Sequence, residues 1–157
     1  MAWLAISPII ALSAGMILLL LLDLLPSSAV LRRAVFLLSW IAAAAFEARV
    51  FHGRPELVLD GSLLSGPSSA LWGFVFLASL LVAWTSAQRY YREESRFQVE
   101  HDVLMLCSTV GMMLMAGAQN LLVFFVGLEL LSVPLYALAG FQRSRSSSET
   151  SVRSADW

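Results

Sequence analysis

The stretch VGLELLSVPLYALAG, residues 126–140, has the composition of a membrane-spanning helix except for one acidic residue, Glu129. Between residues 103 and 142, Glu129 is the only charged residue. A helix needs about 20 mostly apolar residues to cross the hydrocarbon core of a bilayer, and the sequence around Glu129 supplies them. The sequence therefore predicts a membrane helix that carries a carboxyl group in its middle.

The whole chain of 157 residues shares this apolar character. It is 59% hydrophobic and 13% charged, and its mean hydropathy is +0.77. A soluble domain usually has about a quarter charged residues. Strands cross lipid as closed barrels, and their signature of alternating hydrophobicity is missing from this sequence. We therefore expect an all-α, polytopic membrane protein in contact with the lipid bilayer, and we expect no nucleic acid among its partners.

Apolar stretches predict five transmembrane helices, at about residues 4–25, 31–51, 70–90, 103–117 and 120–140. Residues 1–141 then form the transmembrane region, and we expect the first helix to be retained rather than cleaved. Residues 52–68 are rich in Gly, Pro and Ser and predict a loop, and residues 91–101 predict a charged loop. Asn120 can cap the fifth helix. The Ser/Arg-rich tail, 142–157, is expected to be disordered.

The basic residues predict the orientation of the chain. It has ten Arg and no Lys. In the five-helix arrangement eight of these Arg lie on one side, and two, Arg49 and Arg54, lie on the other. Because basic residues concentrate on the cytoplasmic side of a membrane, we expect the N-terminus outside and the tail in the cytoplasm.

Glu129 is the main candidate for a functional residue. A charged side chain at the bilayer centre costs roughly 2.5–3.5 kcal/mol on insertion scales, so such residues usually face protein or water and have a role. Ser132 and Tyr136 follow at i+3 and i+7, which places them on the same helix face. We interpret these three residues as candidates for proton translocation. The alternative is a protonated, structural Glu that bonds a neighbouring helix.

Pro134 lies next to this polar face. It cannot donate a backbone hydrogen bond to the carbonyl of Leu130, and its ring clashes there. The sequence therefore predicts a helix kink beside Glu129 and a freed carbonyl group at Leu130.

Other polar residues indicate no further site. Five lie near the predicted membrane edges and are expected to be solvated there: Asp23, Glu47, Arg49, His101 and Asp102. The Met residues of the fourth helix suit packing. Two His and the single Cys107 offer no metal cluster, and no phosphate-binding loop or nucleophile–base pattern appears. We expect no catalytic residue, no cofactor site and no metal site in this chain.

The run STVGMMLMAGAQNLLVFFVGLELLSVPLYALAGFQR, residues 108–143, resembles the fourth and fifth helices of subunit N of proton-pumping NADH:quinone oxidoreductase, respiratory complex I. In that family a Gly/Met-rich helix and a short turn lead into a helix of the form F-x-G-x-E-L-x-S-x-P-L-Y. The matching positions are Phe125, Gly127, Glu129, Leu130, Ser132, Pro134, Leu135 and Tyr136. The upstream part is similar more loosely, and the sequence SLLSGPSSALWG replaces the family's usual continuation after the LDG loop.

The resemblance implies a role and a setting for the chain. Glu129 maps to the family's fifth-helix glutamate, which is coupled to a lysine on a later helix in moving protons. NADH, flavin, iron–sulfur clusters and quinone are then expected in other subunits, and the partners are the other membrane subunits of complex I. The expected location is the bacterial inner membrane.

The resemblance also exposes a departure from the family. Family members have more than five helices, whereas this sequence supplies five. The family's lysine on a later helix also has no counterpart here, because this chain has no Lys, and Arg stays protonated and cannot replace it. We therefore expect the N-terminal part of such a subunit, as a fragment or as the product of a truncated or split gene. Two alternatives stay open: a subunit of a related cation/proton antiporter or membrane hydrogenase, and a small membrane protein that packs without transport.

Overall fold

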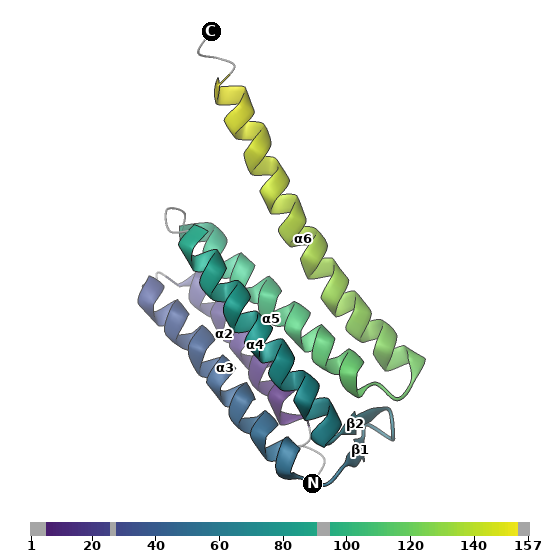
Figure 1. The fold of residues 1–157 in the computed structure, drawn as a ribbon. Coiled ribbons are helices and arrows are strands. Elements are labelled where there is room, and N and C mark those ends of the chain that lie inside the picture. Colours follow the sequence, from purple (N-terminus) through teal and green to yellow (C-terminus); the bar gives the residue numbers. More distant parts are fainter. Residues whose placement is uncertain (1–5, 26–27, 91–94, 154–157) are drawn as a thin grey trace.

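The computed structural model describes residues 6–25, 28–90 and 95–153, and the side chains within 6–25, 28–88 and 99–140. Five helices lie along one another, and a short hairpin closes one end of the bundle (Figure 1). The elements are α2 (Ser7–Leu24), α3 (Ala29–His52), β1 (Glu56–Val58), β2 (Leu63–Ser65), α4 (Pro67–Tyr90), α5 (Ser95–Gly117) and α6 (Leu121–Arg153). Each helix contains a stretch long and apolar enough to cross a membrane. The prediction of an all-α, polytopic membrane protein is confirmed.

Two helix bounds differ from the predicted ones by more than three residues. Helix α5 begins at Ser95, eight residues before the predicted start at residue 103, because a helix can extend beyond the apolar run that crosses the membrane. Helix α6 continues to Arg153, into the segment predicted to be disordered. No Pro or Gly follows Gly140 to interrupt the helical backbone. Residues 154–157 of that segment lie outside the described residues.

The hairpin occupies part of the segment that the sequence analysis predicts to be a loop. Strands β1 and β2 pair antiparallel, with Glu56 opposite Ser65 and Val58 opposite Leu63. The turn between them contains residues with positive φ, Leu59 (54°), Asp60 (53°) and Gly61 (82°). Strands of three residues are too short to show the period-two alternation from which strands are predicted.

Polar side chains mark the starts of several helices. The Ser28 hydroxyl accepts from the Leu31 N–H at 3.3 Å and caps α3. The Asn120 side-chain oxygen accepts from the Val123 N–H at 2.8 Å, as predicted for the fifth helix. Pro8 lies in the first turn of α2, where a missing N–H costs nothing.

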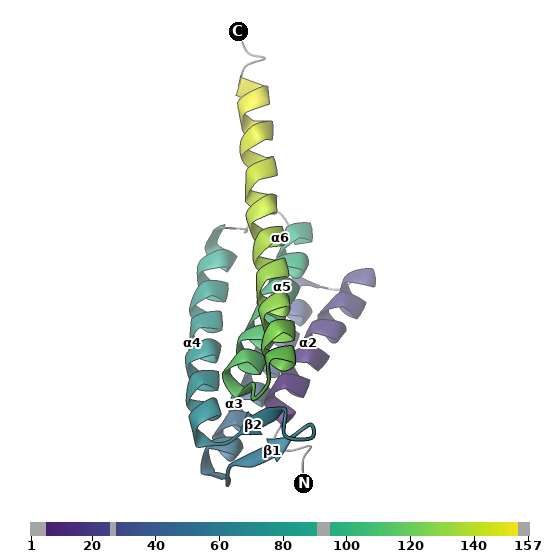
Figure 2. The same cartoon turned by 90° about the vertical axis from the view of Figure 1, so that its right-hand side faces the viewer.

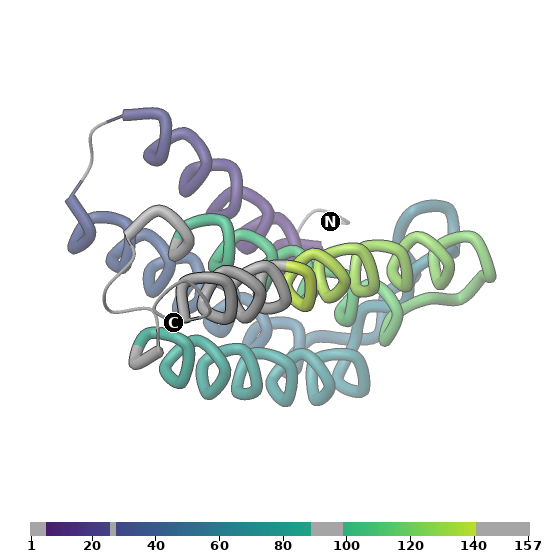
Figure 3. The backbone as a smooth tube through the Cα atoms, turned by 90° about the horizontal axis from the view of Figure 1, so that it is seen from above, coloured from purple at the N-terminus to yellow at the C-terminus, as the bar shows by residue number. Residues whose placement is uncertain are grey.

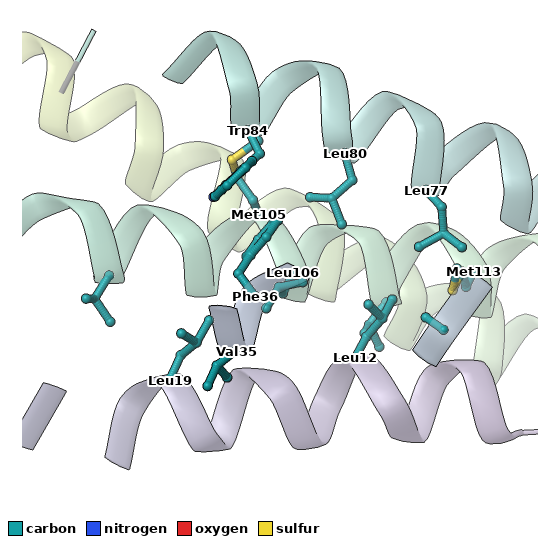
Figure 4. Close-up of a cluster of buried hydrophobic side chains, with 13 residues drawn as sticks. Leu12, Leu19, Val35, Phe36, Leu77, Leu80, Trp84, Met105, Leu106 and Met113 are labelled. Atoms are coloured by element: carbon teal, nitrogen blue, oxygen red, sulfur yellow. The ribbon is translucent and has the colours of Figure 1, made fainter. Parts of the chain in front are cut away.

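The apolar core lies between α2, α3, α4 and α5 (Figure 4). Phe36 of α3 and Trp84 of α4 stack with their ring centroids 4.7 Å apart. The Trp40 indole N–H donates to the Leu77 carbonyl at 2.9 Å. The most deeply buried leucines of the core are Leu12, Leu19, Leu77 and Leu106.

Helix α5 is the centre of the bundle. It packs against α2, α4 and α6, and α2 and α4 lie on opposite sides of it in the view from above (Figure 3). Helix α6 packs on a further side of α5: it lies in front of α5 in Figure 2 and at the edge of the bundle in Figure 1. In its apolar span 11% of the residues are buried, against 44% for α5. One helix is therefore mostly covered by the chain, and the other is mostly uncovered.

Candidate functional site

The predicted polar face lies on the uncovered side of α6. Glu129 is exposed, Ser132 is half-buried and Tyr136 is 75% exposed. Within the described residues, no hydrogen bond or ion pair reaches the Glu129 carboxyl group. The structure thus brings the three residues to one open helix face, and their role in proton translocation stays a prediction.

Close backbone contacts at two glycines show why the face with Glu129 points away from α5. A Cβ atom added at Gly111 of α5 would lie 2.6 Å from the Gly127 carbonyl oxygen and 2.7 Å from the Leu131 nitrogen of α6. Small residues at a helix interface let two backbones approach closely. Glu129 follows Gly127 by two residues, which is about 200° around a helix. With Gly127 against α5, Glu129 must point away from it.

The Ser132 hydroxyl is engaged within its own helix. It donates to the Leu128 carbonyl at 2.6 Å, the usual bond from a Ser to a residue one turn earlier. Its oxygen can still accept a hydrogen bond from a water or a side chain. Ser132 can therefore serve as an acceptor on the Glu129 face.

The Leu130 carbonyl, which Pro134 leaves without its usual helical partner, faces a thiol group of the neighbouring helix. The Cys107 sulfur of α5 lies 3.8 Å from that oxygen, within range of a weak S–H hydrogen bond. Pro134 itself is buried and lies inside a continuous helical element. The freed carbonyl thus receives a donor from α5, and a kink at Pro134 stays a prediction.

Two acids that were predicted to be solvated at the membrane edges are buried instead. Glu47 is 6% exposed and Asp102 is 4% exposed. Asp102 lies inside α5 because that helix begins earlier than predicted, and its Oδ1 is 3.9 Å from His101 Nδ1. Glu47 follows Ser39 and Ala43 at spacings of four, on the buried stripe of α3. That spacing places the three residues on one helix face, which is as much of the burial as the sequence indicates.

The other predicted edge residues have a different setting. Arg49 is exposed, as predicted. The Asp23 carboxylate lies 3.7 Å from the Arg32 guanidinium group, and this ion pair joins the adjacent ends of α2 and α3. In the part of the chain that the structure describes, no group of three His, Cys, Asp or Glu side chains could hold a metal ion.

Comparison with known proteins gives a consistent result. NADH-quinone oxidoreductase subunit N of Ruthia magnifica is 30% identical over 92% of this chain, and subunit N 1 of Symbiobacterium thermophilum is 35% identical over 88% of it. Subunit N 1 of Koribacter versatilis is 32% identical over 93%. This chain is a homologue of subunit N. The resemblance found at residues 108–143 is thereby confirmed.

The homology to subunit N covers part of those relatives. This chain spans 30%, 28% and 31% of their respective lengths. No family model matches it. Its five membrane-crossing helices and its bacterial subunit N relatives agree with a multi-pass protein of the bacterial inner membrane.

Proposed function

We propose that this chain supplies a protonatable carboxyl group, Glu129, to proton translocation by a membrane complex of the NADH-quinone oxidoreductase type. The observation that carries the proposal is the solitary acid within the apolar span Leu121–Gly140, which has a mean hydropathy of 2.2. The names of the subunit N relatives favour this complex over a related antiporter or hydrogenase.

The exposed face of α6 requires cover from further helices. A carboxyl group that faces lipid is unfavourable, and this chain leaves Glu129 and Tyr136 open. Helices of a longer subunit, or of other membrane subunits of the complex, would enclose the face and supply the cation that Glu129 needs. This chain has no Lys, and an Arg does not release its proton.

The mechanism we propose is electrostatic. Quinone reduction in other subunits, which also hold the flavin and the iron–sulfur clusters, would change the charge next to Glu129. The Glu129 carboxyl would then take up or release a proton, and Ser132, Tyr136 and water would provide hydrogen-bonding groups along its face. The reaction itself needs no cofactor in this chain.

The test is proton transport by the assembled complex with a variant of this chain. Glu129→Gln should lower the number of protons moved per electron pair strongly, and Glu129→Asp should lower it less because the carboxyl group remains. Glu56→Gln is the control, because Glu56 is an exposed acid of the hairpin. Transport that survives in Glu129→Gln would favour the alternative of a protein that packs without transport.

A further inference from the structure

A small cavity lies inside the bundle at its hairpin end, between the helices and strand β2. The cavity has a volume of about 30 Å³, and one water molecule needs at least about 10–15 Å³. Three polar side chains line the cavity, one from α3, one from β2 and one from α4: Glu47, Ser65 and Ser69. The cavity is therefore large enough and polar enough to hold water.

The Glu47 carboxyl group is enclosed between α3 and α4. It lies against Gly73, where a Cβ atom would overlap it, and its Oε2 is 3.0 Å from that Cβ position. Glu47 is 94% buried, and within the described residues its carboxyl group makes no hydrogen bond or ion pair. The missing side chain at Gly73 thus provides the space that this carboxyl group occupies.

No basic side chain of the described part faces Glu47. Arg49 follows it by two residues, which is about 200° around the helix, and is exposed. His52 and Arg54, at the end of α3 and beyond it, are also exposed. His52 Nδ1 lies 2.8 Å from the Ala48 carbonyl oxygen. The positive charges nearest in sequence are therefore directed to solvent.

The elements packed around the cavity bring no charged group, basic or acidic, to Glu47 either. Within the described side chains, α4 has no charged residue, and α5 has none between residues 103 and 117. The acids of the hairpin, Glu56 and Asp60, are exposed. Asp23 lies at the opposite end of α2, and Glu129 lies on the uncovered face of α6.

An ionised carboxylate is strongly disfavoured in such a place, because no cation and no hydrogen-bond donor of the described residues reaches it. A neutral carboxylic acid can both donate and accept one hydrogen bond. The Ser69 hydroxyl donates to the Gly66 carbonyl at 3.0 Å and accepts from the Gly66 N–H at 2.9 Å, which leaves it one acceptor position. We propose that Glu47 is held as the neutral acid and binds a water molecule in this cavity, and that this water donates to the Ser69 hydroxyl oxygen. The chain then has a second proton-binding site, and this site does not depend on the role of Glu129.

The two carboxyl groups lie at similar depths from the hairpin end of the bundle. Glu47 precedes the end of α3 at His52 by five residues, or about 8 Å, and Glu129 follows the start of α6 at Leu121 by eight residues, or about 12 Å, at 1.5 Å per residue. Glu47 faces the interior of the bundle, whereas Glu129 faces outward.

Infrared spectroscopy of the full chain in lipid vesicles tests this proposal through the carbonyl stretch of protonated carboxylic acids. The measurement is made in the Glu129→Gln background, so that the carboxyl group of Glu129 adds no band. At about pH 7 an exposed Glu, with an ordinary pKa near 4.3, is ionised and gives no such band. We expect a carboxylic acid band that persists at this pH and shifts in D₂O because the acid proton exchanges.

Variants assign the band. Glu47→Gln should abolish it, and Ser69→Ala should shift it because a hydrogen-bonding group of the cavity is lost. Gly73→Ala should displace the carboxyl group and shift or abolish the band, whereas Gly140→Ala, with open space around its Cβ position, should leave it unchanged. Absence of the band at pH 7 in the parent, or its persistence in Glu47→Gln, would overturn the proposal. If Glu47→Gln fails to fold, the shift of the carboxylic acid band in Ser69→Ala still tests the proposal.

Discussion

Glu129 and Glu47 are both acids within membrane-crossing helices, yet they have opposite surroundings. Glu129 is conspicuous in the sequence because no charge lies near it, and in the structure it is exposed on α6. Glu47 has Arg49 beside it in the sequence and resembles an edge residue, and in the structure it is buried between α3 and α4. The isolation of a charge along the chain therefore does not measure its burial. The direction in which its helix face points decides that.

The sharpest test of this contrast is chemical modification, for which we expect the largest difference. An apolar carbodiimide, applied to the chain in lipid vesicles, should modify Glu129 and leave Glu47 largely unmodified, because the first faces the lipid and the second is 6% exposed. Mass spectrometry of peptides gives the two yields. Equal yields, or more label on Glu47, would show that the bundle opens around α3 and α4.

The close contact between α5 and α6 gives the next largest effect. Gly111→Ala places a Cβ atom against the backbone of α6, which cannot move aside as a side chain can. We expect a loss of about 1–3 kcal/mol in the free energy of unfolding, the usual cost of overpacking. Denaturant titration in detergent micelles measures it.

Gly140→Ala is the matched control for this substitution. It lies in α6 with no atom within 4 Å of its Cβ position, so that it reports the gain of up to about 1 kcal/mol from the better helix propensity of Ala. A Gly111→Ala variant as stable as Gly140→Ala would mean that α6 is not held against α5 at this point.

A smaller effect is expected where the obstacle is a side chain. Gly73→Ala places a Cβ atom against the Glu47 carboxyl group, the far end of a flexible side chain that can rotate away. We expect a loss of about 1 kcal/mol, the lower end for overpacking. In the Glu47→Ala background the same substitution should cost nothing, because the obstacle is gone. A cost that persists there would place the clash elsewhere.

The smallest effect concerns the thiol group beside Pro134. Cys107→Ala removes the donor to the Leu130 carbonyl and should cost about 0.5 kcal/mol, the lower end for one hydrogen bond. Cys107→Ser keeps a donor and should cost less than Cys107→Ala in the same denaturant titration. The reverse order would indicate that Cys107 contributes through its apolar contacts alone.

The sequence predicts those features that depend on the average polarity of long segments. Five apolar runs give five membrane-crossing helices, and Asn120 marks the start of α6 because its amide is suited to cap a helix. The start of α5 at Ser95 was missed because its first residues are charged, and polarity reports the membrane boundary rather than the end of a helix. The hairpin was missed because three-residue strands carry no period.

The candidate site was predictable in part. The shared face of Glu129, Ser132 and Tyr136 follows from helical spacing within one element. The cavity beside Glu47 does not, since it depends on where Gly73 of α4 and Ser65 of β2 come to lie in three dimensions. The spacing of Ser39, Ala43 and Glu47 does indicate a common face. It does not indicate whether that face points to lipid or to other helices.

The attachment of the hairpin to the start of α6 has a rotational consequence. The Asn120 amide donates to the Ser62 hydroxyl at 2.8 Å, and the Gln119 N–H donates to the Ser62 carbonyl at 2.9 Å. These bonds hold the azimuth of the first turn of α6, and a rigid helix transmits that angle along its axis. Removing one residue between Asn120 and Glu129 would turn Glu129 by about 100° relative to the anchored end, since a helix has 3.6 residues per turn. The hairpin contains none of the candidate residues for proton translocation. It nevertheless sets the direction in which Glu129 points in the plane of the membrane.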